Sequence, residues 1–135
     1  MKPEFTPIIA ALQAALPGLK GVYLFGSRAD GTARRDSDYD LAFLAPDHSL
    51  SDYALYRLRS QLAALLNAEV DLIDLYRAST VLQFQVVAKG RRVFSADKLF
   101  CDEFDLFVFS SYQRLNEGRR EIIQDVHQRG FVYAR

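Results

Sequence analysis

The sequence predicts an α/β (α+β) domain in which a small mixed sheet is flanked by helices and followed by a long C-terminal helix. Two observations predict this class. Short apolar segments alternate with longer segments of helical period, and a helical pattern runs from Asp97 to about Gln128. The length of 135 residues is usual for one domain, 1–135, with a core over about 6–95 and a helical segment over about 97–129.

The first half of the chain predicts one helix and two strands. Thr6-Pro7 is a helix-start signal, and the apolar residues after it recur at helical spacing, which predicts a helix over 6–16. The apolar, aromatic segment 21–25 lies between glycines and predicts a buried strand. The polar segment 27–37 predicts a loop with room for one helical turn, and the alternation over 38–45 predicts a second strand.

The second half continues the alternation of helix and strand. Ser51 is suited to cap a helix that ends near Asn67, and segment 70–75 has strand composition. A further helix from Ser79 to Lys89 ends at Gly90 and precedes a short edge strand over 91–94.

The C-terminal helical pattern carries many aromatic residues. Phe100, Phe104 and Phe107 fall roughly on one face, which we expect to pack on the core. Phe109 and Tyr112 lie off that face and are candidates for contact with a partner. One long helix and two helices broken at Gly118 both fit the pattern.

Composition narrows the classes of partner. Seventeen basic residues balance seventeen acidic ones, so no global field favours stable binding of a nucleic acid. Thirteen of the basic residues are arginine, which suits small anionic ligands. Cys101 is the only cysteine, which excludes an internal disulfide, and no apolar run is long enough for a membrane span. We therefore expect a cytoplasmic protein with no membrane partner.

Asp38 and Asp40 are two residues apart on the second predicted strand. Their side chains project from the same face, with Cα atoms about 6.6 Å apart, so the carboxylates can converge on one point. Close carboxylates repel each other unless one is protonated or a cation lies between them, and hard oxygen ligands favour Mg²⁺ or Mn²⁺. Two or three carboxylates leave such an ion incompletely coordinated, and the phosphates of a nucleoside triphosphate would complete it.

The Gly26-Ser27 pair precedes these acids and suits phosphate binding. A glycine lets the backbone approach closely, and backbone N–H groups and the Ser27 hydroxyl can donate to phosphate oxygens. Arg28, and one of Arg34 or Arg35, would add charged contacts, with the choice between those two left open.

A third carboxylate is expected from the neighbouring predicted strand. Asp71 and Asp74 have opposite parity on that strand and cannot face the same site. Asp74 shares its face with apolar residues, so Asp71 is the preferred metal ligand and the base for an attacking hydroxyl.

Together these motifs resemble a known family. Gly26-Ser27, ten intervening residues and Asp38-Tyr39-Asp40, followed by an isolated strand acid, are similar to the nucleotidyltransferase fold of the DNA polymerase beta superfamily. The small size and the segment GSRADGTARRDSDYDL most resemble the minimal nucleotidyltransferases. The long aromatic C-terminal helix resembles that of the MntA antitoxins, which pair with HEPN-domain toxins. The run Arg34-Arg35-Asp36 departs from the family, whose members often carry a proline there.

The resemblance implies roles for five residues: Gly26 and Ser27 hold the nucleotide, and Asp38, Asp40 and Asp71 are the catalytic and metal-binding acids. Arg28 and Ser37 are further candidates for nucleotide binding. Two Mg²⁺ ions, or Mn²⁺ in their place, and ATP as co-substrate are implied with them.

The resemblance also implies an activity. MntA-like proteins transfer AMP from ATP to a tyrosine of a cognate HEPN ribonuclease toxin and inactivate it, so a hetero-oligomer with that toxin is expected. Two alternatives stay open. One is nucleotide transfer to a small molecule such as an aminoglycoside, although such enzymes usually have a larger C-terminal domain. The other is a non-catalytic antitoxin that acts by binding.

Overall fold

Four strands form one mixed sheet in the computed structural model, which describes residues 2–129 and the side chains of residues 2–120. The strands are β1 (Gly21–Phe25), β2 (Tyr39–Leu44), β3 (Val70–Asp74) and β4 (Arg91–Ser95), in the order β3-β2-β1-β4. β1 is antiparallel to both β2 and β4, whereas β2 and β3 are parallel. The predicted mixed sheet is confirmed, and β4 is an edge strand as expected.

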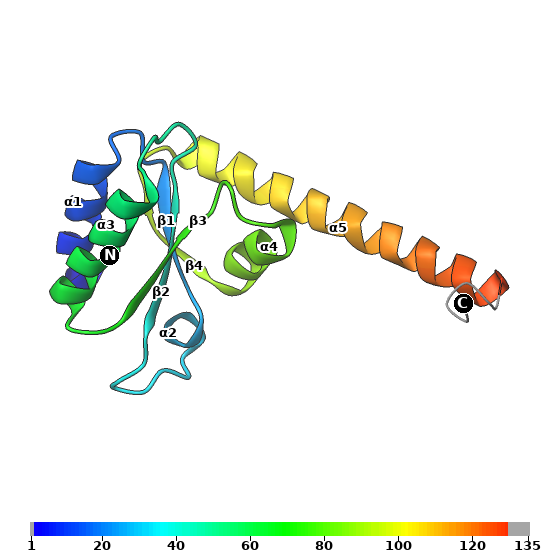
Figure 1. The fold of residues 1–135 in the computed structure, drawn as a ribbon, viewed down its shortest axis with the longest axis horizontal. Coiled ribbons are helices and arrows are strands. Elements are labelled where there is room, and N and C mark those ends of the chain that lie inside the picture. Colours follow the sequence, from blue (N-terminus) through cyan, green and yellow to red (C-terminus); the bar gives the residue numbers. More distant parts are fainter. Residues whose placement is uncertain (1, 130–135) are drawn as a thin grey trace.

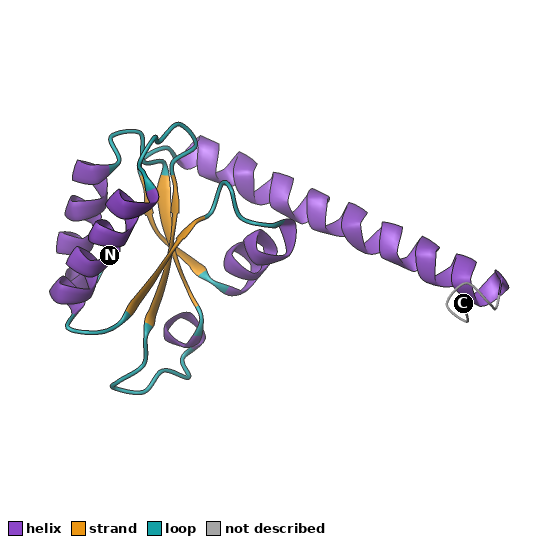
Figure 2. Cartoon of the chain, viewed as in Figure 1, coloured by secondary structure: helices purple, strands orange, loops and turns teal. Residues whose placement is uncertain are grey.

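Helices cover both faces of this sheet (Figures 1 and 2). The helical elements are η1 (Pro3–Phe5), α1 (Thr6–Ala15), α2 (Ser27–Asp30), α3 (Asp52–Leu66), α4 (Thr80–Lys89) and α5 (Lys98–Arg129). Strand side chains alternate between the faces, which divides the core into two clusters. Leu24 and Leu41 pack with α1 and α3, whereas Tyr23 and Ala42 pack with α4 and α5.

The predicted helix ends agree closely with the structure. The hydroxyl of Ser51 accepts the N–H of Ala54 at 3.1 Å, and that of Ser79 accepts the N–H of Leu82 at 3.2 Å. Asn67 ends α3 in the left-handed conformation. These caps satisfy N–H groups that the first helical turns leave without partners.

α5 is one continuous helix that passes through Gly118 without a break, so the single-helix alternative is correct. Its first turns lie beside α4, and its later part projects beyond the rest of the domain (Figure 1). Of the helices described, none combines the length and the apolar character that a membrane span requires.

The inner face of α5 differs from the predicted one. Its buried side chains are Cys101, Phe104 and Val108. Phe107, expected in the core, is 58% exposed, so that part of the prediction is wrong. Tyr112 and Phe109, expected to face a partner, pack on Phe84 of α4 with ring centroids 3.7 and 5.7 Å apart. The neighbouring α4 thus decides which aromatic face of α5 is covered.

A polar network fastens α5 to the sheet. Arg92 of β4 donates to Asp105 at 2.6 Å and to Asp102 at 2.9 Å, and the Tyr23 hydroxyl of β1 donates to Asp105 at 2.6 Å. Burial, followed by the hydrogen bond to Asp105, raises the pKa of Tyr23, so the phenol stays a donor. The network therefore links β1, β4 and α5 through one carboxylate.

We expect Asp105→Ala to destabilise the domain, because it leaves the Tyr23 hydroxyl and the Arg92 guanidinium without their shared acceptor. Loss of one member of such a partly buried network costs about 2–3 kcal/mol in the free energy of unfolding. Urea denaturation measures this loss. The control is Lys98→Ala, which removes an 81% exposed side chain from its pair with Asp102 and should cost less than about 1 kcal/mol. Equal losses in the two variants would contradict the anchoring role of Asp105.

Candidate active site

Asp40 and Asp71 lie opposite each other on neighbouring strands. They are register partners in the parallel β2–β3 pair, and Asp40 also faces Phe25 across the β1–β2 pair. Asp38 immediately precedes β2. Register partners project from the same face, so Asp40 and Asp71 share the side of the sheet on which Ala42 packs with α4 and α5. The structure brings together the acids that strand alternation selects.

The surroundings of Asp40 disfavour its negative charge. Burial has the largest influence, the charges of Asp71 and Asp38 add to it, and all three raise the pKa of Asp40. In the described part of the chain, no lysine, arginine or histidine forms an ion pair with these three acids. Their mutual repulsion is therefore left for a bound cation to relieve.

The chemistry of this donor set fits a hard divalent cation. Carboxylate oxygens suit Mg²⁺ and Mn²⁺, which retain open positions for water and phosphate. As the described side chains stand, no three His, Cys, Asp or Glu residues are arranged to hold a metal ion. Asp38 and Asp71 are both exposed, so their side chains are free to turn toward an ion shared with Asp40.

Asp74, the other acid of β3, belongs to a separate group of contacts. Its Oδ2 lies 2.6 Å from Nε2 of His48 and 3.0 Å from Nη1 of Arg77. Its register partner is Phe43, three residues along β2 from Asp40. Asp74 is therefore distant from Asp40 along the strand, and its carboxylate is already in contact with His48 and Arg77.

Gly26 forms the turn between β1 and α2. Its φ of 71° lies in the left-handed region that favours glycine, and a Cβ at this position would overlap Oδ2 of Asp40. Ser27 then begins the short helix α2, in which the N–H groups of Ala29 and Asp30 donate to the carbonyl of Gly26, and those of Ser27 and Arg28 precede these bonds. The turn therefore sets hydrogen-bond donors for an anion directly beside the carboxylates.

Arg28 and Ser37 shape the loop between α2 and β2. Nη2 of Arg28 donates to the carbonyl oxygens of Ser37 at 2.7 Å and Arg35 at 3.3 Å. The Ser37 hydroxyl accepts the N–H of Arg34 at 2.7 Å. The guanidinium of Arg28 also lies 4.0 Å from the ring centroid of Tyr39. These contacts close the polar loop just before the acids, while Arg34 and Arg35 are themselves exposed.

Tyr39 keeps Arg28 away from the carboxylates. Its buried ring belongs to the cluster that packs with α1 and α3, on the opposite face from Asp40. Its hydroxyl donates to Oε2 of Glu4 at 3.3 Å, and burial, followed by the charge of Glu4, raises the pKa of Tyr39. The contact of Arg28 and Ser37 with phosphate stays a prediction. Sequence reasoning overlooked Tyr39 and Glu4, although strand alternation already separates Tyr39 from the acids.

Comparison with known families identifies the class of protein. Residues 8–99 match the family described as Polymerase beta, Nucleotidyltransferase. The match covers more than half of the chain and includes the Gly26 turn and all three acids. The chain therefore belongs to this nucleotidyltransferase family.

Individual relatives of this chain are protein adenylyltransferases of the MntA type. The chain is 43% identical over 122 residues to the protein adenylyltransferase MntA of Shewanella oneidensis, a match that covers 88% of this chain and 84% of that one. A second protein adenylyltransferase MntA, from Aphanizomenon flos-aquae, is 28% identical over 116 residues, with 77% and 73% covered.

Solved structures share the fold over nearly the whole chain. A chain from a toxin–antitoxin structure with AMP-PNP has a TM-score of 0.79 at 40% identity, covering 93% of this chain and 99% of that chain. A chain from the complex of tri-AMPylated Shewanella oneidensis HEPN toxin with MNT antitoxin has a TM-score of 0.74 at 37% identity, covering 92% and 96%. The likeness extends to the projecting helix as well as the sheet.

We expect Gly26→Ala to cost more stability than Gly31→Ala. Both glycines have positive φ, 71° and 82°, so alanine is strained by about 1–2 kcal/mol at either position. Only at Gly26 does the added Cβ collide with the Asp40 carboxylate, because nothing lies within 4 Å of it at Gly31. In urea unfolding, Gly26→Ala should lose about 1–3 kcal/mol more than Gly31→Ala. Equal losses would mean that Asp40 does not constrain the turn.

Proposed function

We propose that this chain transfers AMP from ATP to a tyrosine hydroxyl of a HEPN-domain toxin in the cytoplasm, and so acts as the antitoxin of that toxin. The observation that carries the proposal is the opposition of Asp40 and Asp71 beside the Gly26 turn. It is supported by the 43% identity to a protein adenylyltransferase and by the AMPylated toxin in a related complex.

In this proposal the three acids bind metal ions, and one of them also accepts a proton. Asp38 and Asp40 would hold two Mg²⁺ ions, with Asp71 as a further ligand. When bound, the ions would neutralise charge on the α-phosphate and on the departing pyrophosphate. The tyrosine oxygen forms a bond to the α-phosphorus, the bond to pyrophosphate breaks, and the carboxylate of Asp71 accepts the tyrosine proton.

The turn after β1 orients the nucleotide in this proposal. Gly26 lets the backbone approach the phosphates, and the N–H groups and hydroxyl at Ser27 donate to their oxygens. Arg28 and Ser37 support the same site indirectly, because their mutual contact closes the loop that leads to Asp38. Donors fixed before the reaction need no reorganisation as charge develops.

A protein substrate suits the surface of this chain better than a small molecule. On α5, Leu99 and Leu106 are each 68% exposed and Phe107 is 58% exposed. Exposed apolar side chains in this number on one helix are typical of a contact with another protein. The same surface would also serve an antitoxin that acts by occlusion alone, so the test must separate catalysis from binding.

The test compares the wild-type chain with the double variant Asp38→Ala and Asp40→Ala. Each protein is incubated with ATP, Mg²⁺ and the HEPN protein encoded beside it, and the toxin is measured by intact-mass spectrometry and by its ribonuclease activity. We expect the wild type to add AMP and silence the toxin. The double variant should lose at least 100-fold in transfer rate and still form the complex.

The matched control replaces two exposed acids outside the site, Asp36→Ala with Asp47→Ala, and should transfer AMP at the wild-type rate. Absence of AMP on the toxin after incubation with the wild type would overturn the proposal. Full silencing of the toxin by Asp38→Ala with Asp40→Ala, without AMP, would establish occlusion in its place.

A further inference from the structure

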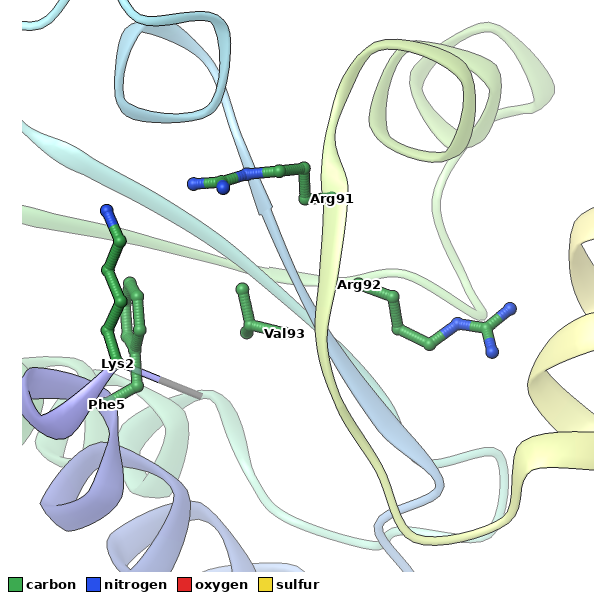
Figure 3. A pocket seen from close by; sticks show the side chains of 5 residues that line it. All are labelled: Lys2, Phe5, Arg91, Arg92 and Val93. Carbon is green, nitrogen blue, oxygen red and sulfur yellow. The ribbon is translucent and has the colours of Figure 1, made fainter.

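A cationic pocket lies at the start of the edge strand β4, beside η1. It has a volume of about 400 Å³ and is lined by Lys2, Phe5, Arg91, Arg92 and Val93. Figure 3 shows the ammonium of Lys2 and the guanidinium of Arg91 extending toward the same space, while Arg92 points to the other side of the strand. Two cationic side chains from distant parts of the sequence therefore meet at one site.

The cations of this pocket differ in how they are paired with acids. Arg92 is held by Asp102 and Asp105, whereas no ion pair of Lys2 or Arg91 occurs among the described side chains. The neighbouring acid Glu4 has its carboxylate against the Tyr39 hydroxyl.

The apolar part of the lining is largely buried. Phe5 is only 3% exposed, and Val93 is partly buried against the α1/α3 cluster. The lining therefore offers no free aromatic face, and the cations are the groups that would recognise a ligand, by pairing with its phosphate oxygens.

The pocket lies at the same end of the sheet as the catalytic acids but on the other face. Arg91 is the register partner of Leu24, and the next residue, Phe25, is the partner of Asp40. Leu24 packs with α1 and α3, so Arg91 projects to that face, whereas Asp40 projects to the α4/α5 face. A nucleotide held at the acids therefore leaves this pocket free for a second anion.

We propose that this pocket binds an AMP group already transferred to the substrate, with Lys2 and Arg91 on its phosphodiester, and so promotes the addition of further AMP units. The inference rests on the proposed function. Each transfer joins an acceptor hydroxyl oxygen to the α-phosphorus of one ATP, releases pyrophosphate and a proton, and leaves one phosphodiester anion on the substrate. A related complex contains a tri-AMPylated toxin, so a substrate that already carries AMP has to be bound again.

The test measures the rate of each successive AMP addition by the double variant Lys2→Ala with Arg91→Ala. In intact-mass time courses of the toxin with ATP and Mg²⁺, the first addition should keep its wild-type rate within twofold. The second and later additions should slow about tenfold, the effect of losing a charged contact. Affinity for purified singly AMPylated toxin, measured by titration calorimetry, should fall about tenfold, while affinity for unmodified toxin is unchanged.

Two further variants test whether the effect depends on positive charge and on its position in this pocket. Arg91→Lys retains the charge and should keep most of the later additions. Arg57→Ala with Arg59→Ala removes two exposed cations of α3 and should behave as wild type.

Each other outcome has a separate meaning. An unchanged pattern of additions with Lys2→Ala and Arg91→Ala would overturn the inference, as would a single addition by the wild type. An equal loss at the first addition would also overturn it, because the pocket would then serve ATP or the unmodified toxin. Absence of any AMP with the wild type would instead overturn the proposed function itself.

Discussion

The repulsion between Asp40 and Asp71 is the constraint on which the site depends. Two carboxylates that face each other on neighbouring strands destabilise a sheet unless a cation or a proton lies between them. Asp38 adds a third charge, and burial, followed by the charges of Asp71 and Asp38, raises the pKa of Asp40. The parallel pairing of β2 with β3 fixes this opposition, because a one-residue slip would turn Asp71 to the other face.

The two faces of the sheet carry different parts of the structure around the acids. On the face of the acids, Gly26 brings backbone donors against Asp40, and α4 and α5 cover the sheet beyond. On the other face, Arg28 packs over Tyr39 and closes the loop before the acids. The network around Asp105 fastens the start of α5 to the sheet.

The sequence predicted those parts that depend on local rules. Strand alternation placed Asp38 with Asp40 and separated Asp71 from Asp74, and helix caps such as Ser51 set the helix ends. Local rules could not predict contacts between segments that are distant in the sequence. The contacts of Arg28 with the carbonyl oxygens of Ser37 and Arg35 depend on how the loop folds, so local rules could not predict them. Phe107 was assigned to the core because several faces of the aromatic-rich α5 look apolar, and the position of α4 decides among them.

The most direct test of this account is the free energy of unfolding of the wild type and of Asp71→Asn at neutral pH, each with and without excess Mg²⁺. Without Mg²⁺, Asp71→Asn should be more stable by about 0.2–1 kcal/mol, because a like charge opposite Asp40 has been removed. With Mg²⁺, the wild type should gain stability and the variant should gain little, because the ion binds the folded site. A less stable Asp71→Asn without Mg²⁺, or an equal gain from Mg²⁺ in both proteins, would contradict the account.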